Sequence, residues 1–208
     1  MSRASAPTQR AIRADESYQT AGACIGELAP GMSLFALTRG QWSMIDAILW
    51  CLRQTGPARL SIWTWTIADY EIQAFTALRS SGGIREGRMV IDHGARNKNA
   101  ALIAGWKEQF GSESVRYVVN HAKIATIEGG GLKLLLRGSM NLNFNPRFEQ
   151  FDLSEGGPAF DLVREVEDEL PILGDDAPGA AAYAASRLGE AFEPEQLAIF
   201  QKVKTWAK

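Results

Sequence analysis

The chain contains few cysteines and few histidines, two of each among its 208 residues. Cys24 and Cys51 lack the paired spacing of a zinc site, and two thiols do not make a disulfide framework, so a reducing compartment is the simpler interpretation. Two histidines likewise leave no cluster with the spacing of metal ligands. We therefore expect the protein to use no metal ion and no other cofactor.

A large excess of one charge and a long hydrophobic run are also missing. Lys and Arg number 22 and Asp and Glu number 24, which gives a net charge of −2. This balance excludes a general polyanion-binding protein, so any nucleic-acid surface has to be local. No apolar run approaches roughly 18 residues, and the polar N-terminus lacks the hydrophobic segment of a signal peptide. We expect a cytoplasmic protein without a transmembrane helix or stable membrane association.

Strand and helix patterns alternate through the middle of the chain. β-Prone runs cover residues 32–37, 60–67, 88–92 and 115–119, and apolar residues recur at helical spacing in residues 41–54, 69–80, 97–110 and 159–170. Alternation with short loops favours a mixed or parallel sheet with helices on both faces. The expected fold class is therefore α/β.

The length fits one sizeable domain with appendages. Residues 1–30 show no clear periodicity and are expected to form an N-terminal tail or a loosely docked arm. Residues 31–173 hold the alternating pattern and form the main domain. Residues 174–208 begin with a Gly- and Pro-containing linker followed by two helical patterns, which predicts a C-terminal helical extension.

The most informative stretch is residues 120–149, NHAKIATIEGGGLKLLLRGSMNLNFNPRFE. Two β-prone runs separated by glycines predict a β-hairpin. Residues two apart in a strand share a face, so His121 and Lys123 are expected to point the same way. If Glu128 pairs with Gly131 across the turn, His121 lies opposite Gly138.

The same pairing brings Ser139 and Asn141 to the open end of the hairpin. An imidazole, an ammonium, a hydroxyl and a carboxamide would then converge there, and this set suits a phosphodiester. A neutral His121 can attack phosphorus and form a phosphohistidine. Lys123 and Asn141 can stabilise the charge that develops on the phosphoryl oxygens, so a metal ion is not required.

This order of residues, H-x-K, an apolar strand, an acidic residue and G-S-x-N, resembles the HKD motif of the phospholipase D superfamily. The resemblance covers roughly residues 58–155. Glu128 stands five residues after Lys123, where the family has Asp, and the Gly-Ser pair arrives three residues later than usual because the turn holds three glycines. A single copy of the motif is similar to the small bacterial endonucleases of the superfamily. The resemblance implies a phospholipase D-like catalytic domain over residues 31–173.

The resemblance also implies roles for individual residues. His121 would be the nucleophile, Lys123, Ser139 and Asn141 phosphate ligands, and Glu149 the acidic residue that orients the nucleophilic histidine. Superfamily enzymes use a second HKD histidine, which a C2 homodimer would supply. The implied protein is a homodimeric, metal-independent phosphodiesterase, a nuclease whose substrate is nucleic acid.

Glu128 and Asp92 are possible supporting residues. Strand parity turns Glu128 away from Lys123, which favours a turn-capping or structural role. Asp92 ends a strand, where open α/β sheets usually bind ligands, and is expected to make loop or core hydrogen bonds. His93, the next residue, is a weaker candidate for the active site.

Two other functions stay open. A phospholipase or phosphatidyl-transfer enzyme would need an apolar, membrane-facing rim, and a catalytically decayed binding module would keep the fold and the dimer alone. Trp63 and Trp65 share a face and are expected to form core or dimer contacts rather than stack on bases. Scattered basic residues could rim a groove for a polyanion, namely Arg85, Arg88, Arg96, Lys98, Lys107, Arg137 and Arg147.

Overall fold

The computed structural model describes residues 9–13, 18–142 and 146–170. The chain divides into two units, Met1–Ile172 and Leu173–Lys208. The predicted C-terminal extension lies outside the described residues.

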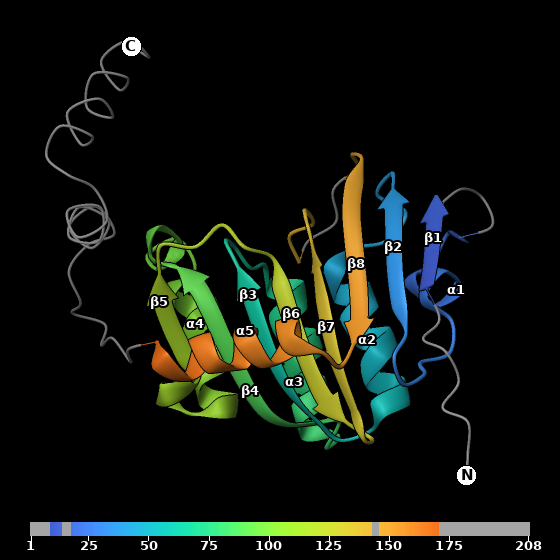
Figure 1. The fold of residues 1–208 in the computed structure, drawn as a ribbon. Coiled ribbons are helices and arrows are strands. Elements are labelled where there is room, and N and C mark those ends of the chain that lie inside the picture. The colour runs from blue at the N-terminus through green and yellow to red at the C-terminus, as the bar shows by residue number, and fades with distance from the viewer. Residues whose placement is uncertain (1–8, 14–17, 143–145, 171–208) are drawn as a thin grey trace, which may run out of the picture. The chain divides into compact units, whose positions relative to one another are not determined.

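An eight-stranded mixed sheet spans the described part of this unit (Figure 1). Its spatial order is β1-β2-β8-β7-β6-β3-β4-β5. Neighbours are parallel in the pairs β1–β2, β3–β4 and β4–β5, and antiparallel in the others. The strands are β1 (Gln9–Arg13), β2 (Ser33–Thr38), β3 (Ala58–Thr64), β4 (Ile84–Asp92), β5 (Val115–Val118), β6 (Ile124–Gly129), β7 (Leu132–Gly138) and β8 (Glu149–Glu155).

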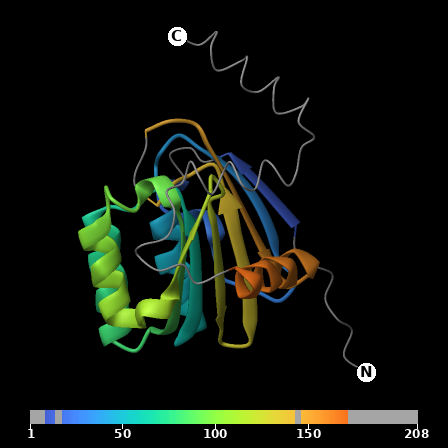
Figure 2. The same cartoon turned by 90° about the vertical axis from the view of Figure 1, so that its left-hand side faces the viewer.

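Helices cover both faces of the sheet, as the sequence predicts. The helices α2, α3 and α4 lie against one face and α5 crosses the other, and the turned view of Figure 2 keeps the sheet between them. Short 3-10 helices follow β4 (η2, His93–Ala95) and α4 (η3, Ser112–Ser114). The α-helices are α1 (Ala21–Ile25), α2 (Met44–Thr55), α3 (Asp69–Ser80), α4 (Ala100–Phe110) and α5 (Pro158–Glu169). The α/β fold class is therefore confirmed.

The core forms where the apolar side of each strand meets α2, α3 and α4. Alternate residues of β3 point into it, and Leu60 and Ile62 are fully buried. Ile48 of α2 and Phe75 of α3 are at most 1% exposed on the facing helices. Ser43 is the N-cap residue of α2. Its backbone N–H donates to Asp46 Oδ2 at 2.8 Å, as in a capping box.

The predicted hairpin is present, but its predicted register is wrong. Glu128 pairs with Lys133, not with Gly131. Gly130 and Gly131 form the two-residue turn, and both have positive φ, 58° and 79°, as a type I′ turn requires. A Cβ on Gly129 would lie 2.8 Å from Ala58 Cβ, and one on Gly130 would lie 2.7 Å from the Thr55 carbonyl oxygen, so close packing requires glycine at both positions.

The N-terminal interval that was expected to be a tail or arm contributes to the fold. Strand β1 pairs in parallel with β2, and Cys24 and Ile25 of α1 are fully buried. The Arg10 guanidinium donates to the carbonyls of Cys24 at 2.8 Å and Ile25 at 2.7 Å, which ties β1 to α1. Cys24 and Cys51 are both free thiols. None of the described helices has the length and apolarity needed to cross a membrane.

Candidate active site

All eight strands bring one end to the same edge of the sheet. Strands β1, β2, β3, β4, β5 and β7 end at this edge, and β6 and β8 begin there, because β6 and β8 run antiparallel to their neighbours (Figure 1). The segment from Asn120 to Lys123 connects β5 to β6 along this edge, and Ser139 and Asn141 follow β7. The structure thus gathers His121, Lys123, Ser139 and Glu149 at one edge, and Asn141 follows Ser139 by two residues.

His121 and Lys123 are in contact. Lys123 Nζ donates to the His121 carbonyl at 2.9 Å and lies 3.1 Å from Nδ1 and 3.4 Å from Nε2 of the ring. The His121 side chain is exposed, whereas Lys123 is 8% exposed. The predicted shared face of these two residues is therefore present, with the ammonium deeper than the imidazole.

The Lys123 ammonium is buried without close neutralisation. Among the described residues, no carboxylate lies within ion-pair distance of Nζ. Burial lowers the pKa of Lys123, and the negative charge of Glu149 opposes part of that shift. A buried cation with one remote counter-charge is costly unless an anion binds beside it.

Ser139 and Glu149 form a pair across β7 and β8. The Ser139 hydroxyl donates to Glu149 Oε2 and accepts from the Gln150 backbone N–H at 2.9 Å. Ser139 N–H donates in turn to the Gln150 carbonyl at 3.1 Å. The single hydroxyl proton of Ser139 is thus used inside the protein. A phosphate oxygen would have to replace Glu149 to receive that proton.

Gly138 and Asn141 flank this pair in different ways. A Cβ on Gly138 would lie 2.2 Å from the Gln150 carbonyl oxygen, so only glycine allows β7 to approach β8 here. Asn141 Oδ1 is buried and has no hydrogen-bond partner among the described residues. Leaving a buried amide oxygen unsatisfied costs stability, and the missing partner has to be a hydrogen-bond donor.

Asn120 is a positioning residue that the sequence reasoning missed. It is 5% exposed, and its Nδ2 donates to the carbonyls of Thr64 at 3.1 Å and Ala122 at 3.2 Å. Its Oδ1 accepts from Ala122 N–H at 2.8 Å. These bonds fix the backbone on both sides of His121. An Asn placed directly before H-x-K, after a β-prone run, was the available signal.

Asp92 holds the same segment from β4. Its Oδ2 accepts from Asn120 N–H at 2.9 Å, and its Oδ1 accepts from Gly94 N–H at 2.8 Å. Asp92 therefore makes loop hydrogen bonds at the site edge. His93 is 6% exposed and packs against Tyr117, with 6.1 Å between ring centroids, so its imidazole lies inside the protein.

The two tryptophans of the LSIWTW stretch have different surroundings. Trp63 donates from Nε1 to Glu167 at 2.7 Å. Trp65 is 49% exposed, and its ring centroid lies 6.1 Å from that of His121. A core role for Trp65 is therefore wrong, and its ring forms one wall beside the imidazole.

Glu128 lies at the other end of the hairpin. It pairs with Lys133 in β7 and with Arg59 in β3, one pair before the glycine turn. Five residues of strand at about 3.3 Å each separate it from Lys123, roughly 16 Å. The structure does not bring Glu128 to the site.

Among the described residues, no three His, Cys, Asp or Glu side chains are grouped so that they could hold a metal ion. Comparison of the chain with protein-family models and with curated proteins finds no match.

Proposed function

We propose that the protein is a metal-independent phosphodiesterase, a nuclease that acts through a phosphohistidine on His121 in a homodimeric active site. The observation that carries the proposal is the Lys123 ammonium, which is buried against an imidazole and has no carboxylate of the described residues within ion-pair distance. Asn141, two residues after Ser139, would add its side-chain N–H as a second donor to an oxyanion, while its buried Oδ1, an acceptor, would need a donor from elsewhere. This combination fits a phosphoryl group better than a neutral ligand.

The chemistry has two displacements. A ring nitrogen of His121 attacks phosphorus, the N–P bond forms, and the bond to the leaving ester oxygen breaks as that oxygen takes a proton from a general acid. Water then attacks phosphorus and gives a proton to the same group, now a base, and the N–P bond breaks. Lys123 and Asn141 stabilise the phosphoryl oxygens in both steps.

The general acid is assigned to His121 of a second copy of the chain, across a two-fold axis. Support comes from apolar side chains exposed around this edge. Trp65, Val119 and Phe148 are 49%, 56% and 65% exposed, at the end of β3, the end of β5 and the start of β8. Such a group is suited to contact a second copy or the bases of a substrate.

The test is cleavage of labelled oligonucleotides with EDTA present. The wild-type protein should cleave, and His121→Ala should not, while its circular dichroism stays unchanged because the side chain is exposed. Mass spectrometry of trapped protein should place on the His121 peptide an adduct of the phosphoryl group together with the nucleoside ester that it keeps. The peptide that carries His93, the other histidine of the chain, is the internal control and should stay unmodified.

Three results would contradict this proposal. Activity that is lost in EDTA and restored by a divalent ion would exclude the phosphohistidine route. Release of head groups from lipid vesicles without cleavage of nucleic acid would identify a phospholipase or phosphatidyl-transfer enzyme. Tight nucleic-acid binding without turnover or adduct would identify a non-catalytic module.

A further inference from the structure

A cavity of about 500 Å³ lies at the opposite edge of the sheet from His121. The start of β4, the end of α4 and the following η3 form its walls. Strand β4 runs from this cavity to Asp92 at the site edge, a length of roughly 25 Å for eight steps of about 3.3 Å. The lining residues include Arg59, Arg79, Arg85, Arg88, Phe110 and Ser112.

Two of these arginines have no carboxylate partner in the part of the chain that the structure describes. Arg79 donates to the backbone carbonyls of Ile84 at 3.2 Å and Arg85 at 2.6 Å, which fixes its guanidinium without neutralising it. The exposed Arg85 side chain makes no ion pair or hydrogen bond among the described residues. Arg59, by contrast, pairs with Glu86 at 3.3 Å.

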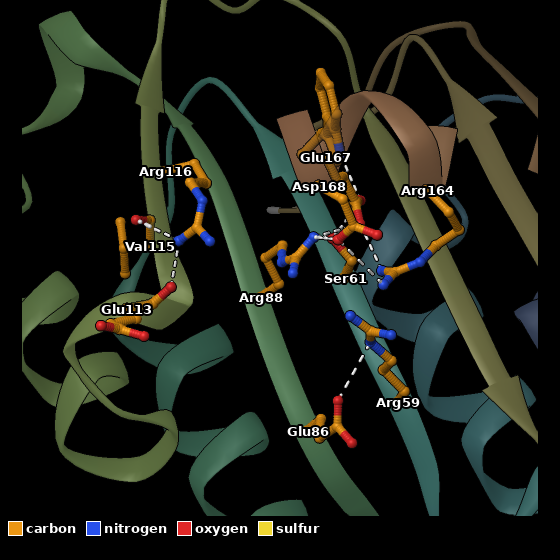
Figure 3. A network of polar contacts seen from close by, with 11 residues as sticks. Arg59, Ser61, Glu86, Arg88, Glu113, Val115, Arg116, Arg164, Glu167 and Asp168 are labelled. Atoms are coloured by element: carbon orange, nitrogen blue, oxygen red, sulfur yellow. Dashed lines mark hydrogen bonds and ion pairs between the residues drawn. The ribbon is translucent and has the colours of Figure 1, made fainter. Parts of the chain in front are cut away.

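The sheet face next to the cavity carries three further arginines, Arg88, Arg116 and Arg164, with carboxylates among them (Figure 3). Arg88 reaches from the cavity wall to Asp168 of α5 at 2.7 Å and to the fully buried Glu167 at 3.6 Å. Glu167 is shared with Arg164. Burial lowers the pKa of Arg116, and the charge of Arg88 adds to that effect.

Carboxylates do not balance the arginines of this region. Among the described residues, four carboxylates pair with these arginines or act on their charge, those of Glu86, Glu113, Glu167 and Asp168, whereas the arginines number six, at residues 59, 79, 85, 88, 116 and 164. Two positive charges are therefore left in one region of a chain whose net charge is −2. Like charges held this close repel one another, and a bound anion would relieve the repulsion.

We propose that this cavity binds a phosphate ester of about mononucleotide size, with its phosphate on Arg85 and Arg79 and its ring system on Phe110. Guanidinium groups match phosphate oxygens in bidentate geometry. The volume lies in the range of small-ligand pockets. Ser112 adds a hydroxyl donor, and the half-buried Phe110 presents an aromatic wall.

The position of Phe110 depends on Gly87 of β4. A Cβ on Gly87 would lie 2.6 Å from the Phe110 ring, so glycine lets the ring sit directly on the strand. The ring also packs on Trp106 with 4.4 Å between centroids. The aromatic wall is therefore held in place before any ligand binds. No cavity residue belongs to the His121 site, so this proposal does not rest on the proposed function.

The experiment is an amide NMR titration of the full chain, because amide shifts report the two sites separately. Adenosine 5′-monophosphate should move the signals of Gly87, Gly111 and Ser112, and inorganic phosphate should move the same signals at higher concentration. Arg85→Gln should weaken this binding on the order of 10- to 100-fold, since it removes a charged hydrogen-bonding partner. Arg53→Gln, at an exposed arginine of α2, is the matched control and should bind as wild type.

Other outcomes overturn the proposal. Unmoved Gly87, Gly111 and Ser112 signals at millimolar nucleotide would refute it, as would unchanged affinity in Arg85→Gln. Nucleotide that moves only the amide signals of Gly138 and Ser139 would also refute it and would place phosphate at the His121 edge alone.

A short oligonucleotide that moves the cavity signals as strongly as the mononucleotide supports a polynucleotide as the source of the phosphate. Movement by the mononucleotide alone supports a free nucleotide.

Discussion

Two asparagines at the candidate site should respond in opposite ways to the same substitution. Asn120 makes three side-chain hydrogen bonds to the protein backbone. Asn141 makes none among the described residues, although its Oδ1 is buried. Asn120→Ala should therefore destabilise the fold, whereas Asn141→Ala should leave the free energy of unfolding unchanged or slightly raised.

The size of the Asn120 effect follows from the bonds it loses. A typical hydrogen bond contributes about 1 kcal/mol net, so three give about 3 kcal/mol. For a chain of this length, about 3 kcal/mol corresponds to a melting temperature roughly 6–12 °C lower. Asn141→Ala removes a buried group without a partner, so no stabilising bond is lost.

Urea denaturation followed by tryptophan fluorescence measures both variants, with turnover measured in parallel. Asn120→Ala should lose stability and also slow cleavage, because it loosens the backbone around His121. Asn141→Ala should lose cleavage alone, with one oxyanion donor worth about 2.7–4 kcal/mol of transition-state stabilisation. Equal destabilisation of the two variants would refute the reasoning, since it would mean that Asn141 has a structural partner.

Three further predictions concern single side chains. Gly138→Ala should destabilise by about 1–3 kcal/mol in urea melts because its Cβ meets the Gln150 carbonyl, whereas the control Gly105→Ala in α4 should stabilise by up to about 1 kcal/mol. Lys123→Met should be more stable than wild type at neutral pH although inactive. Because the fold lowers the pKa of Lys123, the free energy of unfolding of the wild type should rise as the pH approaches the normal lysine pKa. The stability difference between Lys123→Met and the wild type should therefore shrink over that pH range in urea melts. Burial raises the pKa of Cys24 to about 11 and of Cys51 to about 12, so neither thiol should react with a thiol reagent at pH 8 until the protein is unfolded; rapid labelling of the native protein would contradict this.

The sequence predicts the layers of this fold because local patterns determine them. The helical spacing of Ile45, Ile48 and Leu52 predicts α2, and these residues are buried as expected. The two β-prone runs around the glycines predict β6 and β7. Strand β1 was missed because its five residues carry little apolar pattern and are defined by pairing with β2.

Site details that depend on long-range contacts could not be predicted. The hydrogen bond from Ser139 to Glu149 joins residues 10 apart in the sequence. The bond from Asn120 to Thr64 joins residues 56 apart. The exposure of Trp65 depends on where β3 ends, one residue earlier at Thr64. Each of these arises from tertiary packing rather than from local propensity.

The error in the hairpin register has a consequence for the site. A shift of two residues keeps every side chain on its predicted face, because strand periodicity is two. The shift changes which backbone groups bond across the hairpin, and Gly138 N–H donates to the Lys123 carbonyl at 3.2 Å. Lys123 thereby lies at the end of the ladder and is buried, whereas His121 stands beyond it.

This placement suits the two roles proposed in covalent catalysis, His121 as the nucleophile and Lys123 as the charge-stabilising donor. The backbone at Lys123 is fixed by the ladder, and the backbone around His121 is fixed by Asn120, while the imidazole itself is exposed. A nucleophile has to move toward phosphorus as the new bond forms, and a charge-stabilising donor should stay in place before and after. An exposed ring on an anchored backbone, beside a buried ammonium, meets both requirements.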